Sequence, residues 1–269
     1  IEVVYNTTVG KDISIEEVQK KHDAMYVAIG AQTGKTLNIP GADAKNVVSA
    51  VEILDEIGNG HLPDYTGKKV LVIGGGNVAM DCARSAVRCN AEEVSIVYRR
   101  RQKDMTALES EVESAVMEGI ALVTLQSPVE IKKDAEGNCV SLVTQPQMIS
   151  AYRGDRPAPK DANKPQQEFP ADVIMIAVGQ DIVSAPFEEF GMPAKRNVFQ
   201  AGLDTEVKEL PGVFTGGDCA TGPSTVIRAI AAGKVAAHNI DEYLGYHHTL
   251  LCEAVVPEPK ENMRTFMGR

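Results

Sequence analysis

Residues 69–88 read KVLVIGGGNVAMDCARSAVR, and this stretch decides the fold. The continuous apolar run at 70–73 is typical of a strand that is buried on both faces. From Gly76 to Arg88 the apolar residues recur every three or four positions, which predicts an amphipathic helix. Because a further strand is expected at 94–98, the order of these elements predicts a βαβ unit within a parallel sheet.

The turn between this strand and helix has the pattern G-x-G-x-x-A. Gly74 permits the tight bend, Gly76 lets the backbone approach a pyrophosphate, and Ala79 allows the helix to pack closely on the strand. Free N–H groups at the helix start attract an anion. The alternative is a turn with a structural role only, but its place between strand and helix favours dinucleotide binding. The predicted cofactor-binding residues of this turn are Gly74, Gly75, Gly76, Asn77, Val78 and Ala79.

Three consecutive arginines, at 99–101, follow the strand expected at 94–98. An NAD site usually has an acidic residue here, whereas a guanidinium fork matches a 2′-phosphate. The pattern therefore predicts NADP(H), with Arg99 and Arg100 as the phosphate clamp. The alternative is a solvated basic turn that pairs with Glu92, Glu93 or Asp104, which would leave an NAD-linked reductase open.

A third motif lies near the end of the chain, where a short apolar strand at 212–214 leads into Gly217 and Asp218. A long helix is expected from about Ser224 to Leu244. A fixed acceptor at a strand end and N–H groups at a helix start can hold a polyol and an anion, respectively. From the spacing alone, a simple helix cap is the favoured alternative.

In the first part of the chain, the sequence pattern predicts a strand at 1–5, a short helix from the capping box at 14–17 to about Lys21, and a strand at 24–29. A domain boundary is expected near Pro40, and a short helix at 49–57.

In the middle of the chain, the capping pattern Thr106–Glu109 predicts a helix that ends at Gly119. A hairpin is expected from 129–132 and 140–150, followed by an exposed loop at 153–167 and a strand at 173–178.

The composition excludes several function classes. The length of 269 residues is enough for about two domains. The chain has 27 Lys and Arg against 37 Asp and Glu, which gives a net charge of −10. This acidic balance argues against nucleic-acid and anionic-membrane partners. No apolar run approaches the ~20 residues of a spanning helix, so a cytoplasmic protein is expected. The five cysteines form no C-x-x-C pair, which argues against an iron–sulfur cluster, a zinc site or a dithiol centre and for buried or inert thiols.

The chain resembles the flavoprotein reductases with two dinucleotide-binding domains, in the pyridine nucleotide-disulfide oxidoreductase superfamily. The branch it resembles most is that of the glutamate synthase small subunit. The stretch that carries this resemblance is Tyr98-Arg99-Arg100, Met105, Glu111-Val112, Ala115 and Glu118-Gly119. The family usually has proline at the position of Thr106, and we expect threonine to cap the same helix.

The resemblance implies further cofactor-binding residues. Gly217 and Asp218 resemble the second FAD fingerprint, in which the aspartate contacts the ribityl chain and the following helix start, here Thr225 and Val226, faces the flavin. Two segments resemble those that cross between the FAD and NADPH domains, and they contribute Ala28, Gly30 and Gly179. Ile29 stands where the family usually has a hydroxyl residue.

We therefore expect an α/β protein of two doubly wound Rossmann-like domains. An NADP-binding domain at 41–170 would be inserted into a partial FAD-binding domain formed by 1–40 and 171–245, with a tail at 246–269. Because the chain has a single glycine-rich turn of this kind, the FAD site is expected to be incomplete and the isolated chain inactive.

The resemblance implies a hydride transfer between NADPH and FAD in the intact parent, with onward electron transfer to iron–sulfur centres or a partner subunit. No catalytic side chain and no metal ligand is expected, because the cofactors supply the reactivity. The alternative from another class is a nucleotide-binding or interaction module without activity of its own.

Overall fold

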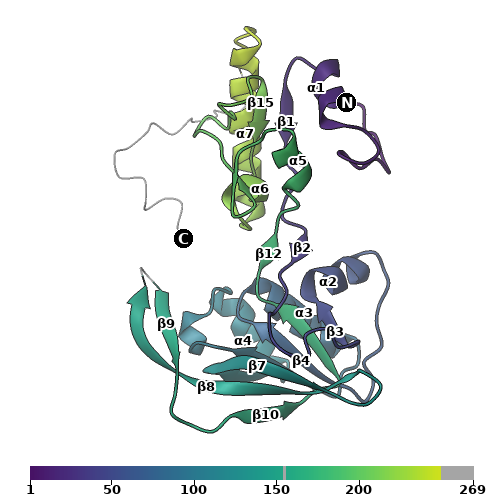
Figure 1. Ribbon diagram of the computed structural model, residues 1–269, viewed down its shortest axis with the longest axis vertical. Coiled ribbons are helices and arrows are strands. Elements are labelled where there is room, and N and C mark those ends of the chain that lie inside the picture. Colours follow the sequence, from purple (N-terminus) through teal and green to yellow (C-terminus); the bar gives the residue numbers. More distant parts are fainter. Residues whose placement is uncertain (154–155, 250–269) are drawn as a thin grey trace. The chain divides into compact units, whose positions relative to one another are not determined.

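The computed structural model describes residues 1–153 and 156–249, and the chain forms two compact units (Figure 1). Unit 1 combines Ile1–Gln32 with the chain from Asp181 onward, and unit 2 is Thr33–Gln180. The expected boundaries at 40/41 and 170/171 both lie inside unit 2. The boundary at 170/171 does so because the strand that follows residue 171 pairs within the sheet of unit 2. Most of the expected tail at 246–269 lies outside the described residues.

Unit 2 is built on a five-stranded parallel sheet, which confirms the expected α/β class. The strand order is β3-β11-β4-β5-β6. The strands are β3 (Val47–Ser49), β4 (Lys69–Gly74), β5 (Glu93–Tyr98), β6 (Ala121–Thr124) and β11 (Val173–Ala177). The apolar run of β4 forms the centre of this sheet, between β11 and β5, because its side chains are buried on both faces.

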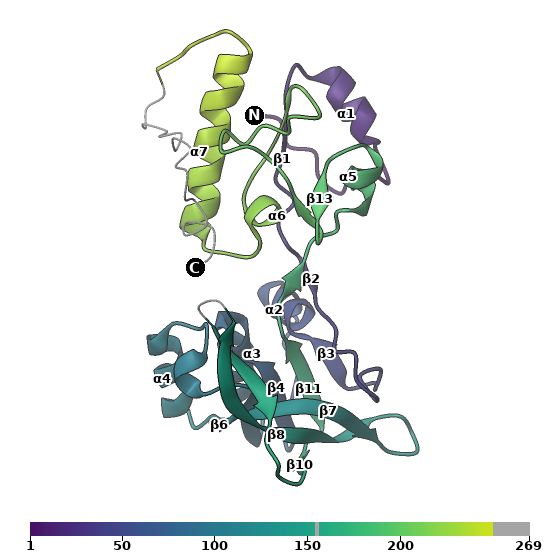
Figure 2. The same ribbon diagram turned by 60° about the vertical axis from the view of Figure 1, so that its left-hand side comes forward.

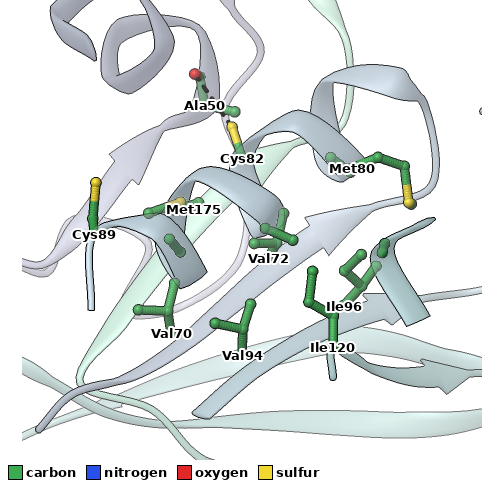
Figure 3. Close-up of a cluster of buried hydrophobic side chains, with 14 of the residues drawn as sticks. Ala50, Val70, Val72, Met80, Cys82, Cys89, Val94, Ile96, Ile120 and Met175 are labelled. Carbon is green, nitrogen blue, oxygen red and sulfur yellow. Dashed lines mark hydrogen bonds between the residues drawn. The ribbon is translucent and has the colours of Figure 1, made fainter. Parts of the chain in front are cut away.

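Helices cover one face of this sheet (Figures 1 and 2). They are α2 (Ala50–Gly58), α3 (Asn77–Arg88) and α4 (Glu109–Met117). The buried face of α3 consists largely of small residues, so that the helix approaches the strands closely; its members are Ala79, Met80, Cys82, Ala83 and Ala86. Figure 3 shows Val70, Val72, Val94 and Ile96 in the same cluster, and a hydrogen bond of 3.5 Å from the Cys82 thiol to the Ala50 carbonyl.

An antiparallel sheet covers the other face. It contains β7 (Gln126–Lys133), β8 (Cys139–Arg153), β9 (Arg156–Asp161) and β10 (Gln167–Pro170). Leu71, Ile73 and Ile174 of the parallel sheet pack there with Ile131 and Leu142. The hairpin expected from 129–132 and 140–150 is confirmed as β7 and β8. The prediction of a loop at 153–167 is wrong in part, since β9 pairs with the C-terminal part of β8.

Unit 1 contains β1 (Met25–Val27) and β15 (Val213–Thr215), which form a two-stranded parallel sheet. Its helices are α1 (Ile15–Lys21), α5 (Ala185–Glu189), α6 (Asp218–Thr221) and α7 (Val226–Tyr243). The short strands β13 (Ala194–Lys195) and β14 (Val198–Phe199) pair with each other in this unit. β2 (Thr33–Gly34) of unit 2 pairs with β12 (Gln180–Asp181), where the chain returns to unit 1. The strand expected at 1–5 is wrong: these residues are exposed and pair with no strand.

Candidate nucleotide-binding site

The glycine-rich turn lies at the point where the strand order of unit 2 reverses. From β4 the chain continues outward through β5 and β6, whereas β11 lies on the opposite side of β4. Gly74 at the end of β4 is the register partner of Ala177 at the end of β11. Ligands of open α/β sheets bind outside the carboxyl ends of the strands at such a point. The topology therefore places the turn where a ligand is expected.

The three glycines of the turn have different surroundings. A Cβ on Gly74 would lie 2.4 Å from the Ala177 carbonyl oxygen, and one on Gly75 would lie 2.5 Å from the ring of Tyr98. Packing therefore requires these two glycines. A Cβ on Gly76 would meet one atom within 4 Å, the Thr106 hydroxyl oxygen at 3.3 Å. Its open side is the space that the approach of a pyrophosphate would need.

Helix α3 begins directly after this open side. Gly76 is its N-cap, and the Gly76 carbonyl accepts hydrogen bonds from the N–H groups of Ala79 at 3.0 Å and Met80 at 3.3 Å. The N–H groups of Asn77 and Val78 precede these two and have no carbonyl acceptor within the helix. They are the donors that the helix start offers to an anion, together with its positive dipole end.

The side chain of Asn77 has a structural contact instead. Its Oδ1 accepts a hydrogen bond of 2.9 Å from the N–H of Leu108, the residue before α4. The expected capping of α4 by Thr106 is wrong, because Leu108 is the N-cap and no side chain bonds there. Thr106 and Ala107 instead donate their N–H groups to the Gly75 carbonyl, at 2.8 and 3.1 Å. Sequence spacing could not reveal this, since the contact joins residues about thirty positions apart.

The three arginines after β5 differ in their contacts. Arg101 forms a bidentate ion pair with Asp104, at 2.7 and 2.9 Å, and this bonding holds the pKa of the Asp104 carboxyl below its usual range. Arg100 donates through Nε to the Pro157 carbonyl of β9 at 2.8 Å. Arg99 is exposed. The solvated-turn interpretation thus describes Arg101, and the clamp formed by Arg99 and Arg100 stays a prediction.

A second strand-end site lies in unit 1. Val27 at the end of β1 is the register partner of Thr215 at the end of β15, and the Thr215 hydroxyl donates to the Val27 carbonyl at 2.9 Å. Ala28 and Gly30 follow the end of β1, and the predicted residues Gly217 and Asp218 follow the end of β15; Gly217 has a φ of 72°. Because the two strands are parallel, both pairs of residues lie at the same edge of the sheet.

The start of α7 is connected to the second site. The Asp218 carboxylate accepts a hydrogen bond of 3.1 Å from the Ser224 N–H, which brings Asp218 beside Thr225, the N-cap of α7. The first turns of this helix expose apolar side chains, with Val226 at 75%, Ile227 at 79% and Ile230 at 54% of full exposure. These three side chains therefore lie outside the buried core of unit 1 in the described residues.

Gly179, the last of the predicted residues, lies in unit 2 after β11. Its carbonyl accepts a hydrogen bond of 3.0 Å from the Lys35 N–H, next to the paired strands β2 and β12. The predicted residues thus form two groups, one at each strand-end site, with Gly179 in the same unit as the glycine-rich turn.

The comparisons with known proteins identify the family of the chain. Residues 3–233 match the family model described as pyridine nucleotide-disulphide oxidoreductase. The chain belongs to this family. Members of the pyridine nucleotide-disulphide oxidoreductase family bind FAD and NADP(H), so the expected cofactor class is confirmed for the family.

Two curated relatives illustrate the branch. The chain is 35% identical to the NADP(+)-dependent formate dehydrogenase subunit beta of Moorella thermoacetica, over 89% of this chain and 34% of that one. It is 31% identical to the glutamate synthase [NADPH] small chain of Azospirillum brasilense, over 90% of this chain and 53% of that one. The resemblance to the glutamate synthase small subunit is confirmed, and the chain spans about a third to a half of the length of these relatives.

The fold also matches a solved structure of an oxidoreductase. Mycobacterium tuberculosis FprA in complex with NADPH superposes with a TM-score of 0.75 at 22% identity, covering 89% of this chain and 68% of that one. At this identity the match concerns the fold. It confirms the Rossmann-like architecture that the sequence predicted.

The described cysteines are buried thiols. Cys82, Cys89, Cys139 and Cys219 are all free, and burial raises the pKa of Cys82 to about 12 and that of Cys139 to about 11. Cys252 lies outside the described residues. Residues 1–153 and 156–249 contain no group of three or more His, Cys, Asp or Glu side chains placed to hold a metal ion. In the same residues, none of the helices has the length and apolar character needed to span a bilayer.

Proposed function

We propose that this chain is the NADPH-binding part of a flavoprotein oxidoreductase similar to the glutamate synthase small subunit. In the intact enzyme, hydride would pass between NADPH and FAD, and electrons would continue to iron–sulfur centres or a partner subunit. The observation that carries this proposal is the glycine-rich turn at the reversal of strand order, with Arg99 and Arg100 at the end of the neighbouring strand.

The residues of unit 2 fit a dinucleotide phosphate. The pyrophosphate would lie over the open side of Gly76, where the first N–H groups of α3 donate. A 2′-phosphate would lie near Arg99, which is exposed, and Arg100, whose Nε bond to Pro157 holds the guanidinium in place. No side-chain acid or base is needed, because nicotinamide and flavin supply the reactivity and the protein supplies binding and orientation.

The residues of unit 1 fit the flavin end of FAD. Asp218 would contact the ribityl chain, and the start of α7 at Thr225 and Val226 would face the flavin. The exposed apolar side chains at this helix start support the role, since an isoalloxazine ring has a large apolar surface. In the described residues this site rests on two parallel strands, so we expect FAD to bind at micromolar or weaker affinity, roughly −8 kcal/mol or less favourable.

A partner subunit is proposed from the relatives. The formate dehydrogenase relative is named as a subunit and the glutamate synthase relative as a small chain, so both names describe parts of larger enzymes. The net charge of −10 supports neither nucleic acid nor an anionic membrane as a partner.

An NAD-linked reductase is the second candidate. It is favoured by the contacts that Arg100 and Arg101 already make within the protein, which give the arginine run a structural role. Calorimetric titration of the purified chain with NADPH and NADH separates the two. The proposed function expects clearly tighter NADPH binding, and equal affinities would favour the NAD-linked alternative.

Flavin retention tests the proposal for unit 1. The purified chain is incubated with FAD and desalted, and its visible absorbance is measured before and after addition of NADPH. We expect little retained flavin and no NADPH-driven bleaching from this chain. A stoichiometric yellow product that bleaches with NADPH would contradict this expectation and show a functional FAD site.

A further inference from the structure

Thr106 lies at the nucleotide site, although no motif placed it there. It is exposed, in the loop between the 3-10 helix η1 (Gln102–Asp104) and α4. Among the described residues, and apart from those next to Gly76 in the chain and its helix, its hydroxyl oxygen is the one atom within 4 Å of the position that a Cβ on Gly76 would occupy, at 3.3 Å. The hydroxyl therefore borders the open side of Gly76, the space proposed for the pyrophosphate.

The backbone around Thr106 is fastened to the turn. The N–H groups of Thr106 and Ala107 donate to the Gly75 carbonyl, and the N–H of Leu108 donates to the Asn77 side chain. Threonine has few side-chain rotamers, because its Cβ is branched. The loop therefore sets the position of the hydroxyl before a ligand arrives.

The hydroxyl has a weak acceptor within the protein. Its hydrogen bond to the Gly75 carbonyl is 3.4 Å long, and that carbonyl already accepts two shorter bonds from the N–H groups of Thr106 and Ala107. A hydroxyl rotates freely about its C–O bond and has one proton to donate. Redirecting that proton to a charged acceptor would cost a poor hydrogen bond and gain a charge-assisted one.

We propose that the Thr106 hydroxyl donates a hydrogen bond to the pyrophosphate of the bound dinucleotide, beside the first N–H groups of α3. This inference rests on the proposed function and adds a binding residue to it. The family usually has proline at this position, which has no donor, so the contact would distinguish this chain from that pattern. Because NADPH and NADH share the pyrophosphate, Thr106 would contribute to affinity and not to the choice between them.

The experiment is a calorimetric titration of the full chain with NADPH and with NADH. Thr106→Val removes the hydroxyl and keeps the shape and the N–H group, and we expect it to weaken both nucleotides by the same factor, about tenfold. Thr106→Ser should retain the affinity of the unchanged chain. Thr66→Val is the matched control, since the Thr66 hydroxyl bonds Asp64 at 2.6 Å in the loop that precedes β4, at the opposite edge of the sheet.

The outcomes are distinct. If Thr106→Val binds both nucleotides as tightly as the unchanged chain, the inference is overturned while the proposed function stands. A loss confined to NADPH, or one that Thr106→Ser does not restore, also overturns it, because a pyrophosphate contact requires neither result. If the unchanged chain binds neither nucleotide, the proposed function fails and this inference fails with it. The thermal unfolding midpoint of each variant checks that the fold is retained.

Discussion

The two strand-end sites both combine glycines after a parallel strand with the start of a helix, but they belong to sheets of different width. In unit 2, the glycine-rich turn ends the central strand of a five-stranded sheet that is covered on both faces. In unit 1, Gly217 and Asp218 end a strand of a two-stranded sheet, and the helix beside them exposes Val226 and Ile227. A glycine and a helix start supply donors in both places, but in unit 2 the strand that ends at the turn is held between β11 and β5 of a wider sheet. We therefore expect unit 2 to bind its ligand by itself and unit 1 to bind weakly.

The largest expected effect in this comparison comes from Gly76→Val. A valine would fill the open side of the turn, so binding of both NADPH and NADH should become unmeasurable by calorimetry. The thermal unfolding midpoint should change little, because the one atom of the described residues that the new Cβ would approach beyond its own helix and chain neighbours is the Thr106 hydroxyl. The control is Gly58→Val at the end of α2, where a Cβ would meet no atom within 4 Å. Unchanged binding by Gly76→Val would return this turn to a structural role.

Replacement of the clamp should have the next largest effect. Arg99→Ala with Arg100→Ala should cost on the order of 3–6 kcal/mol of NADPH binding if the two contributions add, and should leave NADH binding nearly unchanged. Arg100→Ala alone should also lower the unfolding midpoint slightly, because it removes the bond to Pro157. Lys103→Ala, an exposed cation nearby, is the control. Equal losses for both nucleotides would contradict the clamp.

Gly74→Ala should destabilise unit 2 without a direct effect on the ligand. The new methyl group would lie 2.4 Å from the Ala177 carbonyl oxygen, so β4 and β11 would have to separate. We expect a loss of about 1–3 kcal/mol in the free energy of unfolding. Urea unfolding followed by far-UV circular dichroism measures it. A variant as stable as the unchanged chain would show that the two strand ends are less tightly packed than described.

The smallest expected effect is on how the stability of unit 2 depends on pH. Glu118 at the end of α4 bonds Arg88 and Arg84 of α3, and the Arg88 hydrogen bond is the main cause that lowers the pKa of the Glu118 carboxyl from 4.5 to about 2. A carboxyl whose pKa is lowered by folding stabilises the protein above its unfolded pKa and loses this contribution as the pH falls through the folded value. Glu118→Gln should therefore be slightly less stable than the unchanged chain at pH 7.

The difference between Glu118→Gln and the unchanged chain should shrink as the pH falls from 4.5 to about 2. Urea unfolding at several pH values measures it. The exposed Glu113 of the same helix provides the control variant, Glu113→Gln, which should not show this dependence. A stability difference that stays constant across this range would show that the ion pair does not stabilise the packing of α3 on α4.

Local patterns predicted the parts of the fold that depend on neighbouring residues. The apolar run at 70–73 and the helical period after Gly76 predicted β4 and α3, and the capping box at 14–17 predicted the start of α1, where the Ser14 and Glu17 bonds are both present. The strand expected at 1–5 failed for a physical reason. Alternating apolar residues favour an extended chain, but a strand also needs a partner, which local sequence does not specify.

The sequence by itself determined that this chain has a glycine-rich turn between a buried strand and a helix, followed by arginines after the next strand. Only the tertiary structure decided what each of these residues does. It placed Thr106 beside Gly76 and formed a hydrogen bond between the Asn77 side chain and the Leu108 N–H. It also paired Arg101 with Asp104 and bonded Arg100 to the Pro157 carbonyl of β9. The physical reason is that a turn or a helix depends on residues a few positions apart. The acceptor that a side chain finds depends on which strands become neighbours in the sheet.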